Sequence, residues 1–429
     1  MKHIRNQIEE AGGRVFRFGG AVRDAALDRE PRNIDFLVAD LDAEKLEEIL
    51  GSHGTVRDTG LDVPAFAFRR KGAAEEQATF TPARGASIEE DLGRSDFTIN
   101  AMAVDLKTGE RIDPFDGASD LHGRWLRAVT DTVFEDSPIR LIRTSQIAVR
   151  LKFQVDRGTA DLMYSSAKLA RNLEPDEIWP EIVKLLTLGE RPSFGFNIWR
   201  ATGVLGILLK PLADCDVSLG KKRIPNVLDH MLVALDSTPS TKLRVRLAAL
   251  LHDLGKPGTY QEAEDEEESF IGHPGLGAKL AGKLLKRLGA PKDLAKDVKH
   301  LIRNHMFNDA FDLSDSAVRR LLDRVGPDMI GDLFDMRFGD RIASGKPRLA
   351  MGKLGSLRTR IERMLAGEPD KPSVKDLAVN GKDLMEALDI EPGPEVGRIL
   401  RELFERVLFD PDLNKKSKLL KLAREINKS

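Results

Sequence analysis

Residues 19–36 read GGAVRDAALDREPRNIDF, and this stretch is the most informative part of the chain. Gly19 and Gly20 allow the backbone to approach a phosphate group and to donate N–H groups to it. Asp35 lies on the apolar run that follows, where a carboxylate can hold Mg²⁺. The stretch therefore predicts a site for a nucleoside triphosphate and a divalent metal ion.

The composition is that of a soluble globular chain. Of the 429 residues, 41% are hydrophobic and 32% are charged, and the formal net charge is −2. Nucleic-acid binding therefore requires a local basic face. The single cysteine, Cys215, excludes an internal disulfide framework. The apolar runs are too short to cross a bilayer and residues 1–13 contain no secretory h-region, so we expect a cytoplasmic location and no membrane partner.

Short apolar runs alternate with a helical pattern up to about residue 130. The strands that we expect lie at 14–20, 33–39, 65–70 and 99–106, and the helix lies at 41–54. From about residue 135 the strand pattern is lost. Helical periodicity then covers 139–151, 159–173 and 178–188, with breaks at Pro211, 262–268 and 368–373. This predicts an α+β fold: a small mixed-sheet head followed by helical domains.

Three further blocks follow the opening stretch. Glu76 lies in EEQATF, Asp96 lies in EEDLGRSDFTINAMA, and residues 113–129 read DPFDGASDLHGRWLRAV. In this order and spacing, over roughly 120 residues, the blocks resemble the head of the tRNA nucleotidyltransferase and bacterial poly(A) polymerase family. Four co-linear blocks are far more specific than a lone glycine pair.

The resemblance implies that carboxylates hold Mg²⁺ and activate a hydroxyl for attack on a triphosphate. The implied catalytic residues are Asp35, Asp96 and, on a looser alignment, Glu76. The implied nucleotide-binding residues are Gly19, Gly20, Arg23, Asp24, Arg94, Asn100, Asp136, Arg140 and Arg143. The implied partners are ATP or CTP and RNA, above all the 3′ end of tRNA.

Three positions depart from the family pattern. Asn33 replaces the first aspartate of D-x-D, Ser95 replaces the second arginine of R-R-D, and Ser137 replaces the aspartate three residues before Arg140. A neutral asparagine is a weaker ligand for a hard cation, and Ser95 removes a fixed positive charge. The sequence leaves three alternatives: a retuned nucleotidyltransferase, a phosphohydrolase whose head only presents RNA or nucleotide, and a non-catalytic RNA-binding protein.

A second constellation lies in RLAALLHDLGKPGTY, where His252-Asp253 ends an apolar helical run. Imidazole and carboxylate groups together favour a divalent transition metal. The order of histidines and aspartates along the chain resembles that of HD-superfamily phosphohydrolases. The implied ligands are His230, His252, Asp253 and Asp340 for one metal, with His273 and His305 added for a two-metal centre. Lys256 can meet a phosphate oxygen as a point charge.

The sequence from Val379 to Leu420 resembles the end of the HD-bearing bacterial enzymes, so the resemblance covers nearly the whole chain. The domains that we expect are a nucleotidyltransferase head at 1–130, an RNA- or nucleotide-binding neck at 131–210, an HD domain at 211–367 and a helical tail at 368–429. Two basic segments, in the neck and at the C-terminus, are candidates for contacts to an RNA backbone. A homodimer is a further expectation.

Overall fold

The computed structural model describes the chain except for residues 32–33, 60–63, 74–77, 220–225, 262–268, 308–314, 346–349, 367–373 and 428–429. Asn33 and Glu76, and the acidic run at 262–268, lie outside the described residues. The chain divides into two compact units, Met1–Leu354 and Gly355–Ser429.

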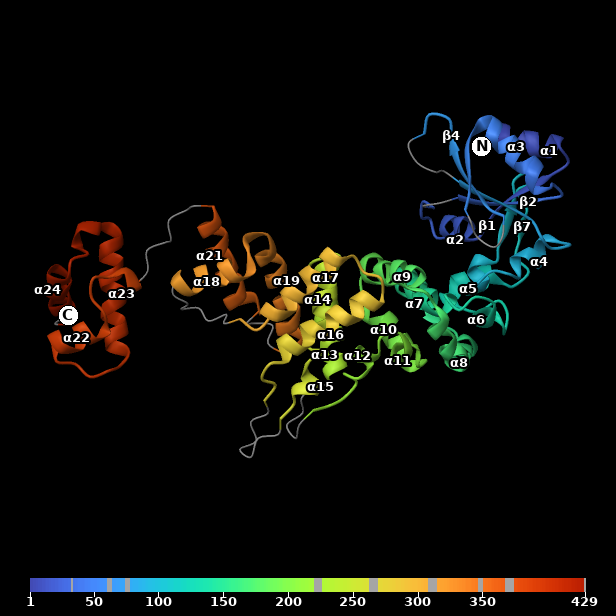
Figure 1. Ribbon diagram of the computed structural model, residues 1–429. Coiled ribbons are helices and arrows are strands. Elements are labelled where there is room, and N and C mark those ends of the chain that lie inside the picture. Colours follow the sequence, from blue (N-terminus) through green and yellow to red (C-terminus); the bar gives the residue numbers. More distant parts are fainter. Residues whose placement is uncertain are drawn as a thin grey trace. The chain divides into compact units, whose positions relative to one another are not determined.

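A seven-stranded mixed sheet forms the core of the head (Figure 1). Its strands are β1 (Arg14–Phe18), β2 (Ile34–Ala39), β3 (Gly54–Asp58), β4 (Phe66–Arg70), β5 (Ala78–Pro82), β6 (Ala103–Asp105) and β7 (Arg111–Ile112), in the order β3-β4-β5-β2-β1-β6-β7. The β2–β5 pair is parallel, and the other neighbours are antiparallel.

Successive side chains of β2 point to opposite faces of the sheet, which explains how both faces are buried. Phe36 and Val38 pack with Ile4 and Ile8 of α1 (Lys2–Glu10) and with α3 (Ala43–His53). The intervening Leu37 packs toward α4 (Ile88–Leu92) on the opposite face. The sequence predicted β1, β2, β4, β6 and α3, whereas it assigned no strand to β3, β5 or β7.

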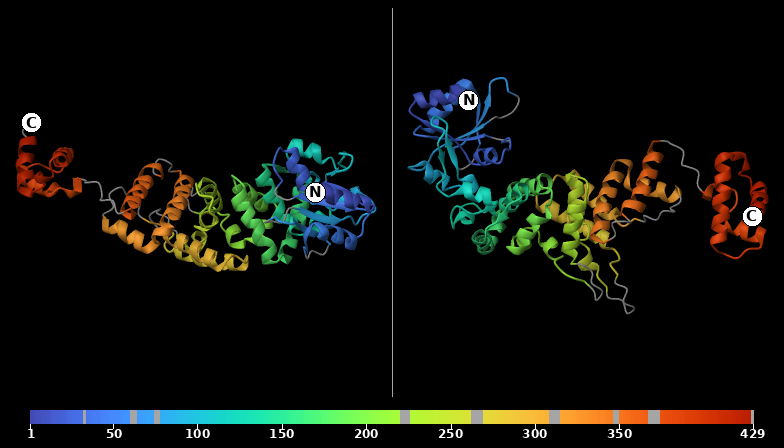
Figure 2. Two further views of the ribbon diagram at one scale, coloured as in Figure 1. Left: turned by 90° about the horizontal axis from the view of Figure 1, so that it is seen from above. Right: turned by 180° about the vertical axis from the view of Figure 1, so that it is seen from behind.

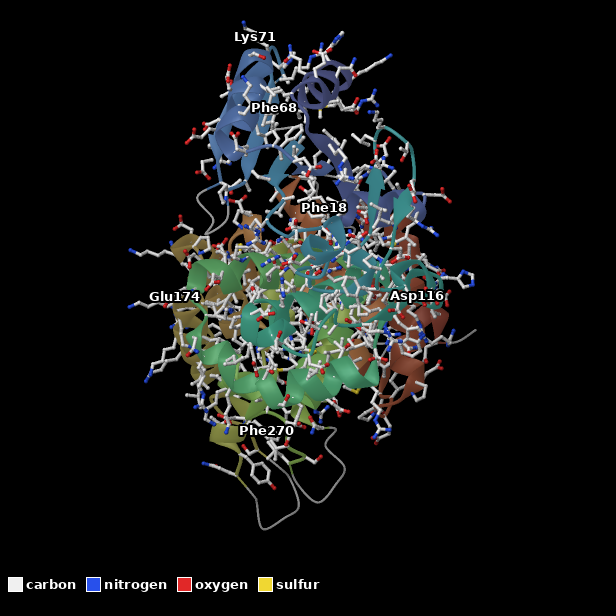
Figure 3. The ribbon with its side chains drawn as sticks, turned by 90° about the vertical axis from the view of Figure 1, so that its right-hand side faces the viewer. Phe18, Phe68, Lys71, Asp116, Glu174 and Phe270 are labelled. Carbon is white, nitrogen blue, oxygen red and sulfur yellow. The ribbon has the colours of Figure 1, made fainter. Side chains whose placement is uncertain are left out.

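The register of the central strands sets the position of the first site. Phe18, the last residue of β1, pairs with Asp35 of β2, and Asp35 also pairs with Thr79 of β5. Gly19 follows Phe18 directly, and α2 begins at Gly20 (Gly20–Ala26). The turn after β1 and the carboxylate of β2 therefore meet at one end of the central strands of the sheet. Figure 3 labels Phe18 at this end and Phe68 farther into the head.

Helices make up almost all of the rest of the first unit. The elements up to the neck are η1 (Thr98–Asn100), α5 (Gly117–Gly123), β8 (Trp125–Leu126), α6 (Val133–Asp136), α7 (Arg140–Leu151), β9 (Gln154–Val155), α8 (Arg157–Ser166), η2 (Ala167–Asn172), α9 (Pro175–Leu188), α10 (Ser193–Ala201), α11 (Val204–Leu208) and α12 (Lys210–Ala213). The helices predicted at 139–151, 159–173 and 178–188 correspond to α7, to α8 with η2, and to α9.

The HD region follows as a helical bundle. Its elements are α13 (Val227–Ser237), α14 (Leu243–Leu251), α15 (Lys256–Thr259), α16 (His273–Arg287), α17 (Lys292–Asn304), α18 (Asp315–Val325), α19 (Pro327–Ala343) and η3 (Ala350–Leu354). From Val245 to Leu251 every residue of α14 is buried. A helix that is buried all round is central, and α13, α17 and α19 pack against it.

The second unit is entirely helical where it is described, and Figure 2 draws it in red and orange. Its elements are α21 (Gly355–Leu365), η4 (Val374–Asp376), α22 (Gly381–Leu388), α23 (Pro394–Phe409), η5 (Pro411–Leu413) and α24 (Lys416–Ile426). Leu384, Ile399, Leu403 and Leu419 share one buried core. Among the described helices of either unit, none is long and apolar enough to cross a membrane.

Candidate functional site

A cavity of about 750 Å³ opens between the edge of the head sheet and the helices of the neck. Of the sequence-predicted residues, those that line it are Gly19, Gly20, Arg23, Asp24, Asp35, Asp96, Asn100, Arg140 and Arg143. Ser95, one of the departures from the family pattern, lines it too. Residues from 19 to 143 thus converge on one space of the size typical of ligand pockets.

The glycine pair forms the turn from β1 into α2. Gly19 has φ +67°, in the left-handed region that favours glycine. Its N–H donates to Met102 O at 3.0 Å, and its carbonyl accepts from the N–H groups of Val22 and Arg23. The Gly19 N–H is therefore used by the fold, and the first turn of α2, from Gly20 onward, borders the cavity.

Asp35 is the carboxylate at the sheet edge of the cavity. Burial raises the pKa of Asp35, while a hydrogen bond from Thr79 and the charge of Arg23 act in the opposite direction. The hydrogen bond from Thr79 and the charge of Arg23 therefore offset only part of the cost of burying the ionised Asp35 carboxylate. A divalent cation bound there would supply the missing positive charge, so the side chain fits the role of a metal ligand.

Four side chains form a continuous polar chain across the cavity floor. Arg23 Nη1 donates to Asn100 Oδ1 at 2.6 Å, and Asn100 Nδ2 donates to Asp96 Oδ1 at 2.7 Å. Arg143 Nη2 lies 3.3 Å from Asp96 Oδ2. Because Asp96 Oδ2 is buried without a hydrogen bond from any described residue, it can still accept a ligand.

Two predicted nucleotide-binding residues lie outside the cavity lining. The Arg94 side chain reaches Glu90 at 3.3 Å, and the exposed Asp136 accepts from Thr132 Oγ1 at 3.0 Å. Ser137, at the end of α6, does not line the cavity either. Arg140 lines it, but its guanidinium donates to Val133 O at 3.2 Å and to Arg94 O at 2.5 Å.

The neck supplies lining residues that the motifs did not indicate. They are Gln146, Ile147, Arg150 and Leu151 of α7, and Glu181, Lys184 and Leu188 of α9. The helical spacing of Arg140, Arg143, Ile147 and Arg150 places them on one face of α7, and this spacing could have identified the face. Arg29 and Glu30 complete the polar rim.

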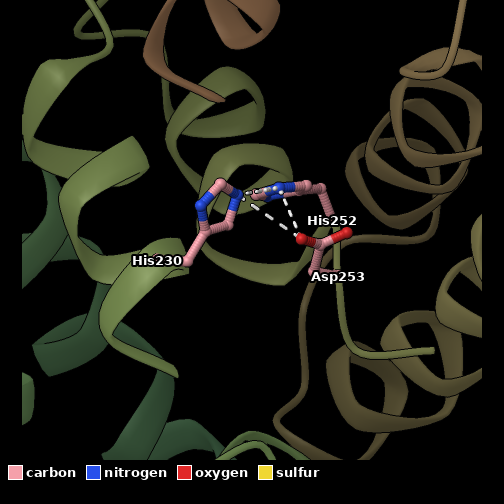
Figure 4. A group of neighbouring side chains, drawn as sticks. All are labelled: His230, His252 and Asp253. Carbon is pink, nitrogen blue, oxygen red and sulfur yellow. Dashed lines mark hydrogen bonds and ion pairs between the residues drawn. The ribbon is translucent and has the colours of Figure 1, made fainter. Parts of the chain in front are cut away.

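The second candidate site gathers the HD residues from five segments, and Figure 4 draws three of them, His230, His252 and Asp253. His230 comes from α13, and His252 and Asp253 follow α14. His230 Nε2 lies 3.2 Å from His252 Nε2 and 3.4 Å from Asp253 Oδ2. Asp340 Oδ1 of α19 lies 3.1 Å from His230 Nε2. These four side chains form one group of N and O ligands.

The other oxygen of Asp253 faces a second pair of histidines. Asp253 Oδ1 lies 3.5 Å from His273 Nε2 and 3.8 Å from His305 Nε2. It is buried and receives no hydrogen bond from any described residue. The carboxylate therefore bridges two ligand groups, an arrangement that suits two metal ions.

Backbone carbonyls fix the orientation of the imidazole rings. The Nδ1 atoms of His252, His273 and His305 donate to the carbonyls of Ala249, Phe270 and Ile302 at 2.7–2.8 Å. The neutral tautomer that donates from Nδ1 leaves a lone pair on Nε2. A metal ligand requires that lone pair, so burial, which lowers the pKa values of His273 and His305, presets these two rings for coordination. Burial acts in the same direction on His252, but the neighbouring carboxylates Asp253 and Asp340 raise its pKa overall, so this ring has to lose its Nε2 proton when a metal binds.

Electrostatics keep the carboxylates of this centre ionised. Although burial alone raises the pKa of Asp340, the hydrogen bond from His230 and the charges of His252 and Arg337 hold it well below its usual range. Burial likewise opposes ionisation of Asp253, but His252 and Lys256 lower its pKa strongly. Lys256 Nζ lies 2.5 Å from Asp253 Oδ2, so it is also close to any phosphate held there.

A close backbone contact brings His230 and Asp340 together. A Cβ atom added at Gly339 would collide with the carbonyl oxygen of Ala234. Gly339 precedes Asp340 on α19, and Ala234 is one turn after His230 on α13. The missing side chain therefore allows the two helices to approach until their ligands share one site.

The fold and the two sites define a nucleotidyltransferase with an HD domain. Residues 15–127 match the family described as Poly A polymerase head domain, residues 226–324 match the HD domain, and residues 370–423 match a family described as tRNA nucleotidyltransferase domain 2 putative. Both head and HD domains of these kinds typically use divalent metal ions.

Relatives extend this similarity over about 90% of the chain. An A-adding tRNA nucleotidyltransferase of Deinococcus radiodurans is 30% identical over 90% of this chain and 90% of its own length. A CC-adding tRNA nucleotidyltransferase of Thermus thermophilus is 32% identical over 91% and 89%. The chain belongs to the tRNA nucleotidyltransferase family. The CCA-adding enzyme of Bacillus stearothermophilus, solved with CTP, shares the fold: its TM-score is 0.55 at 22% identity, over 99% of this chain and 96% of that one.

Proposed function

We propose that the head adds cytidine or adenosine nucleotides to the 3′ end of tRNA, with CTP or ATP as donor and Mg²⁺ as cofactor. The observation that carries this proposal is the single cavity in which Gly20, Asp35 and Asp96 of the head meet Arg140 and Arg143 of the neck. A triphosphate needs the cations, and a divalent metal needs the carboxylates.

In this proposal Asp35 and Asp96 hold Mg²⁺, and Glu76 remains a candidate third ligand. Arg23, held by Asp24 and Asn100, presents positive charge beside the turn at Gly19 and Gly20. When bound, Mg²⁺ supplies charge neutralisation of the triphosphate and of the attacking hydroxyl. The remaining predicted contacts, Arg94 and Asp136, are assigned to RNA or to the rim of the site.

RNA binding is assigned to the neck and the tail. Arg157, Lys168 and Arg171 are exposed on α8 and η2, where Tyr164 is 70% exposed. Exposed cations beside an exposed aromatic ring suit an RNA backbone and an unstacked base. Lys415, Lys421 and Arg424 are exposed in the tail. The domain boundaries at 130, 210 and 367 belong to the same proposal.

We further propose that the HD centre binds a divalent transition metal and hydrolyses phosphoesters such as 2′,3′-cyclic nucleotides. The observation that favours this activity is the buried set of His230, His252, Asp253 and Asp340 with Nε2 and carboxylate oxygens converging. A bound metal ion supplies hydroxide near neutral pH. Lys256 would then pair with a phosphate oxygen of the substrate.

The alternative for the head is a scaffold that presents RNA or nucleotide to the HD centre. The departures at Asn33, Ser95 and Ser137 favour it, whereas the complete HD ligand set remains compatible with both proposals. The experiment that separates them uses tRNA transcripts truncated at each 3′ position, incubated with each labelled triphosphate separately. Incorporation of C or A at the matching position supports transfer. Binding of the transcripts without any incorporation supports the scaffold.

A further inference from the structure

Two polar groups on the neck wall of the cavity lack partners. Gln146 of α7 is 4% exposed and its Nε2 atom has no hydrogen-bond acceptor among the described residues. Glu181 of α9 is 7% exposed, and its Oε2 atom accepts no hydrogen bond from any of them. Both side chains line the cavity. An unsatisfied buried polar atom destabilises the protein, so the pair is suited to a ligand that restores both bonds.

The surroundings of the pair suit a nucleobase. Ile147, Leu151 and Leu188 line the cavity from the same two helices, α7 and α9, which pack against each other. Apolar side chains accept the flat faces of a base, and a few polar atoms then fix its edge. The same lining includes the glycine turn and Asp35 from the head, which suit the triphosphate.

The charge state of the pair determines which base edge it fits. Glu181 Oε1 accepts from Lys184 Nζ at 2.7 Å, so the carboxylate is paired and offers only acceptors. Gln146 Nε2 offers a donor. Cytosine and adenine each present an amino group beside an unprotonated ring nitrogen, so one donates to Glu181 while the other accepts from Gln146. Uracil and guanine present a carbonyl and a ring N–H at the corresponding positions, which meet the pair with the opposite polarity.

The residues around the departure at Ser137 make other contacts or lie outside the cavity lining. Asp136 accepts from Thr132, Ser137 lies outside the cavity lining, and Arg140 donates to two backbone carbonyls. We propose that Gln146 and Glu181 read the Watson–Crick edge of the incoming base and select cytosine and adenine over uracil and guanine. This inference rests on the proposed nucleotidyl transfer, because it names the residues that set the specificity of the same site.

The test measures nucleotide binding rather than turnover. Isothermal titration calorimetry with Mg²⁺ and non-hydrolysable analogues of CTP, ATP, UTP and GTP gives four affinities for the full chain. We expect CTP and ATP to bind at least about tenfold more tightly than UTP and GTP, since a mismatched edge leaves buried polar atoms unpaired. Glu181→Gln should bring the ratio of the affinities for CTP and ATP to those for UTP and GTP close to one, because an amide can present either its oxygen or its nitrogen. Gln146→Leu should weaken CTP and ATP binding and also reduce the ratio.

Ser145→Ala is the matched control. Ser145 is a fully buried neighbour on α7 whose Oγ atom also lacks a partner among the described residues, but it does not line the cavity. Its substitution should leave the ratio unchanged. Thermal melts of each variant show whether a lost affinity reflects unfolding, and the ratio itself is insensitive to the folded fraction.

The outcomes separate the inference from the proposed function. Equal affinities for all four analogues in the wild-type protein, or full selectivity retained in both variants, overturn the role of Gln146 and Glu181 while triphosphate binding stands. An absence of binding by any of the four analogues removes the nucleotide site of the head, and the inference with it.

Discussion

The Nε2 atoms of His273 and His305 lie 3.2 Å apart, although the Nδ1 atom of each ring already donates to a backbone carbonyl. Burial lowers the pKa of both rings, that of His305 to about 3, so both are neutral at pH 7. Two neutral rings in these tautomers face each other with lone pairs, and neither can donate. A cation between them resolves this arrangement, which is why we assign the rings to a metal centre.

Asp253→Ala should remove the bound metal and the phosphoesterase activity together, because both oxygens of Asp253 face ligand groups. We expect hydrolysis of a 2′,3′-cyclic nucleotide to fall at least about 100-fold. Metal content by mass spectrometry and the rate of hydrolysis are measured on the same preparations. Asp293→Ala, an exposed carboxylate of α17, is the control and should retain both. Equal metal content in Asp253→Ala and wild type would reduce His252-Asp253 to a packing feature.

Asp35→Ala should abolish nucleotidyl transfer, because Asp35 is the cavity carboxylate beside the glycine turn. Loss of a principal metal ligand is expected to lower kcat by at least about 1,000-fold while the HD activity persists. Incorporation of labelled CTP or ATP into truncated tRNA measures the change. A transfer rate that survives the substitution would exclude Asp35 from the catalytic metal site.

Asn33→Asp restores the family's D-x-D pattern and should raise the rate of transfer. A charged carboxylate oxygen binds Mg²⁺ better than an amide oxygen, so the Mg²⁺ concentration required for half-maximal rate should also fall. The comparison is made by Mg²⁺ titration of wild type and variant. If the rate is unchanged or lower, Asn33 is part of a retuned site rather than a defect.

Gly339→Ala should destabilise the first unit by about 2 kcal/mol or more, because its Cβ atom would meet the carbonyl of Ala234. Gly331 lies on the same helix, α19, and a Cβ atom there has no neighbour within 4 Å. Gly331→Ala should therefore stabilise the protein by about 0.5–1 kcal/mol through helix propensity. Urea denaturation of the two variants tests the contrast, and equal effects would mean that α13 and α19 are not in close contact.

Because the thiol of Cys215 is buried, we expect the protein to lose stability in alkaline solution. Burial raises the pKa of its thiol to about 12 from an ordinary 9.0. The thiol of the unfolded chain ionises above pH 9 while the native thiol stays protonated, so the free energy of unfolding should fall by about 1.4 kcal/mol per pH unit between pH 9 and 12. Cys215→Ala should remove this part of the slope. Native Cys215 should also resist alkylation until the chain unfolds, and rapid native labelling would contradict its burial.

The candidate ligands of the HD site could be chosen from sequence because each lies at a helix end or on a helix within a distinct motif. His252 ends a helix that is buried all round, and the remaining ligands fall in the family order. Their convergence depends on contacts such as Gly339 with Ala234, which no local pattern encodes. No local pattern indicated that the two carboxylate oxygens of Asp253 face two different histidine pairs.

Prediction was less complete in the head. The residues of the glycine turn and of the polar chain from Arg23 to Arg143 lie where the motifs indicated, within one cavity. Asp136 lies outside it, and its carboxylate accepts from Thr132, the residue that precedes α6. Gln146 and Glu181 were missed because each resembles an ordinary polar position on an amphipathic helix. Only the packing of α7 on α9 makes them neighbours of the same cavity.

The position of Asp253 between the two ligand groups affects how the HD centre binds metal ions. Asp253 is shared by the two ligand groups, and only the first group has a second carboxylate, Asp340. An ion held through Oδ2 would withdraw electron density from Oδ1 and repel a second cation. The two occupancies should then be stepwise, with a tight first ion and a weaker second one. The number of ions per molecule would follow the free-metal concentration of the surroundings, and the first ion alone would already bind Asp340.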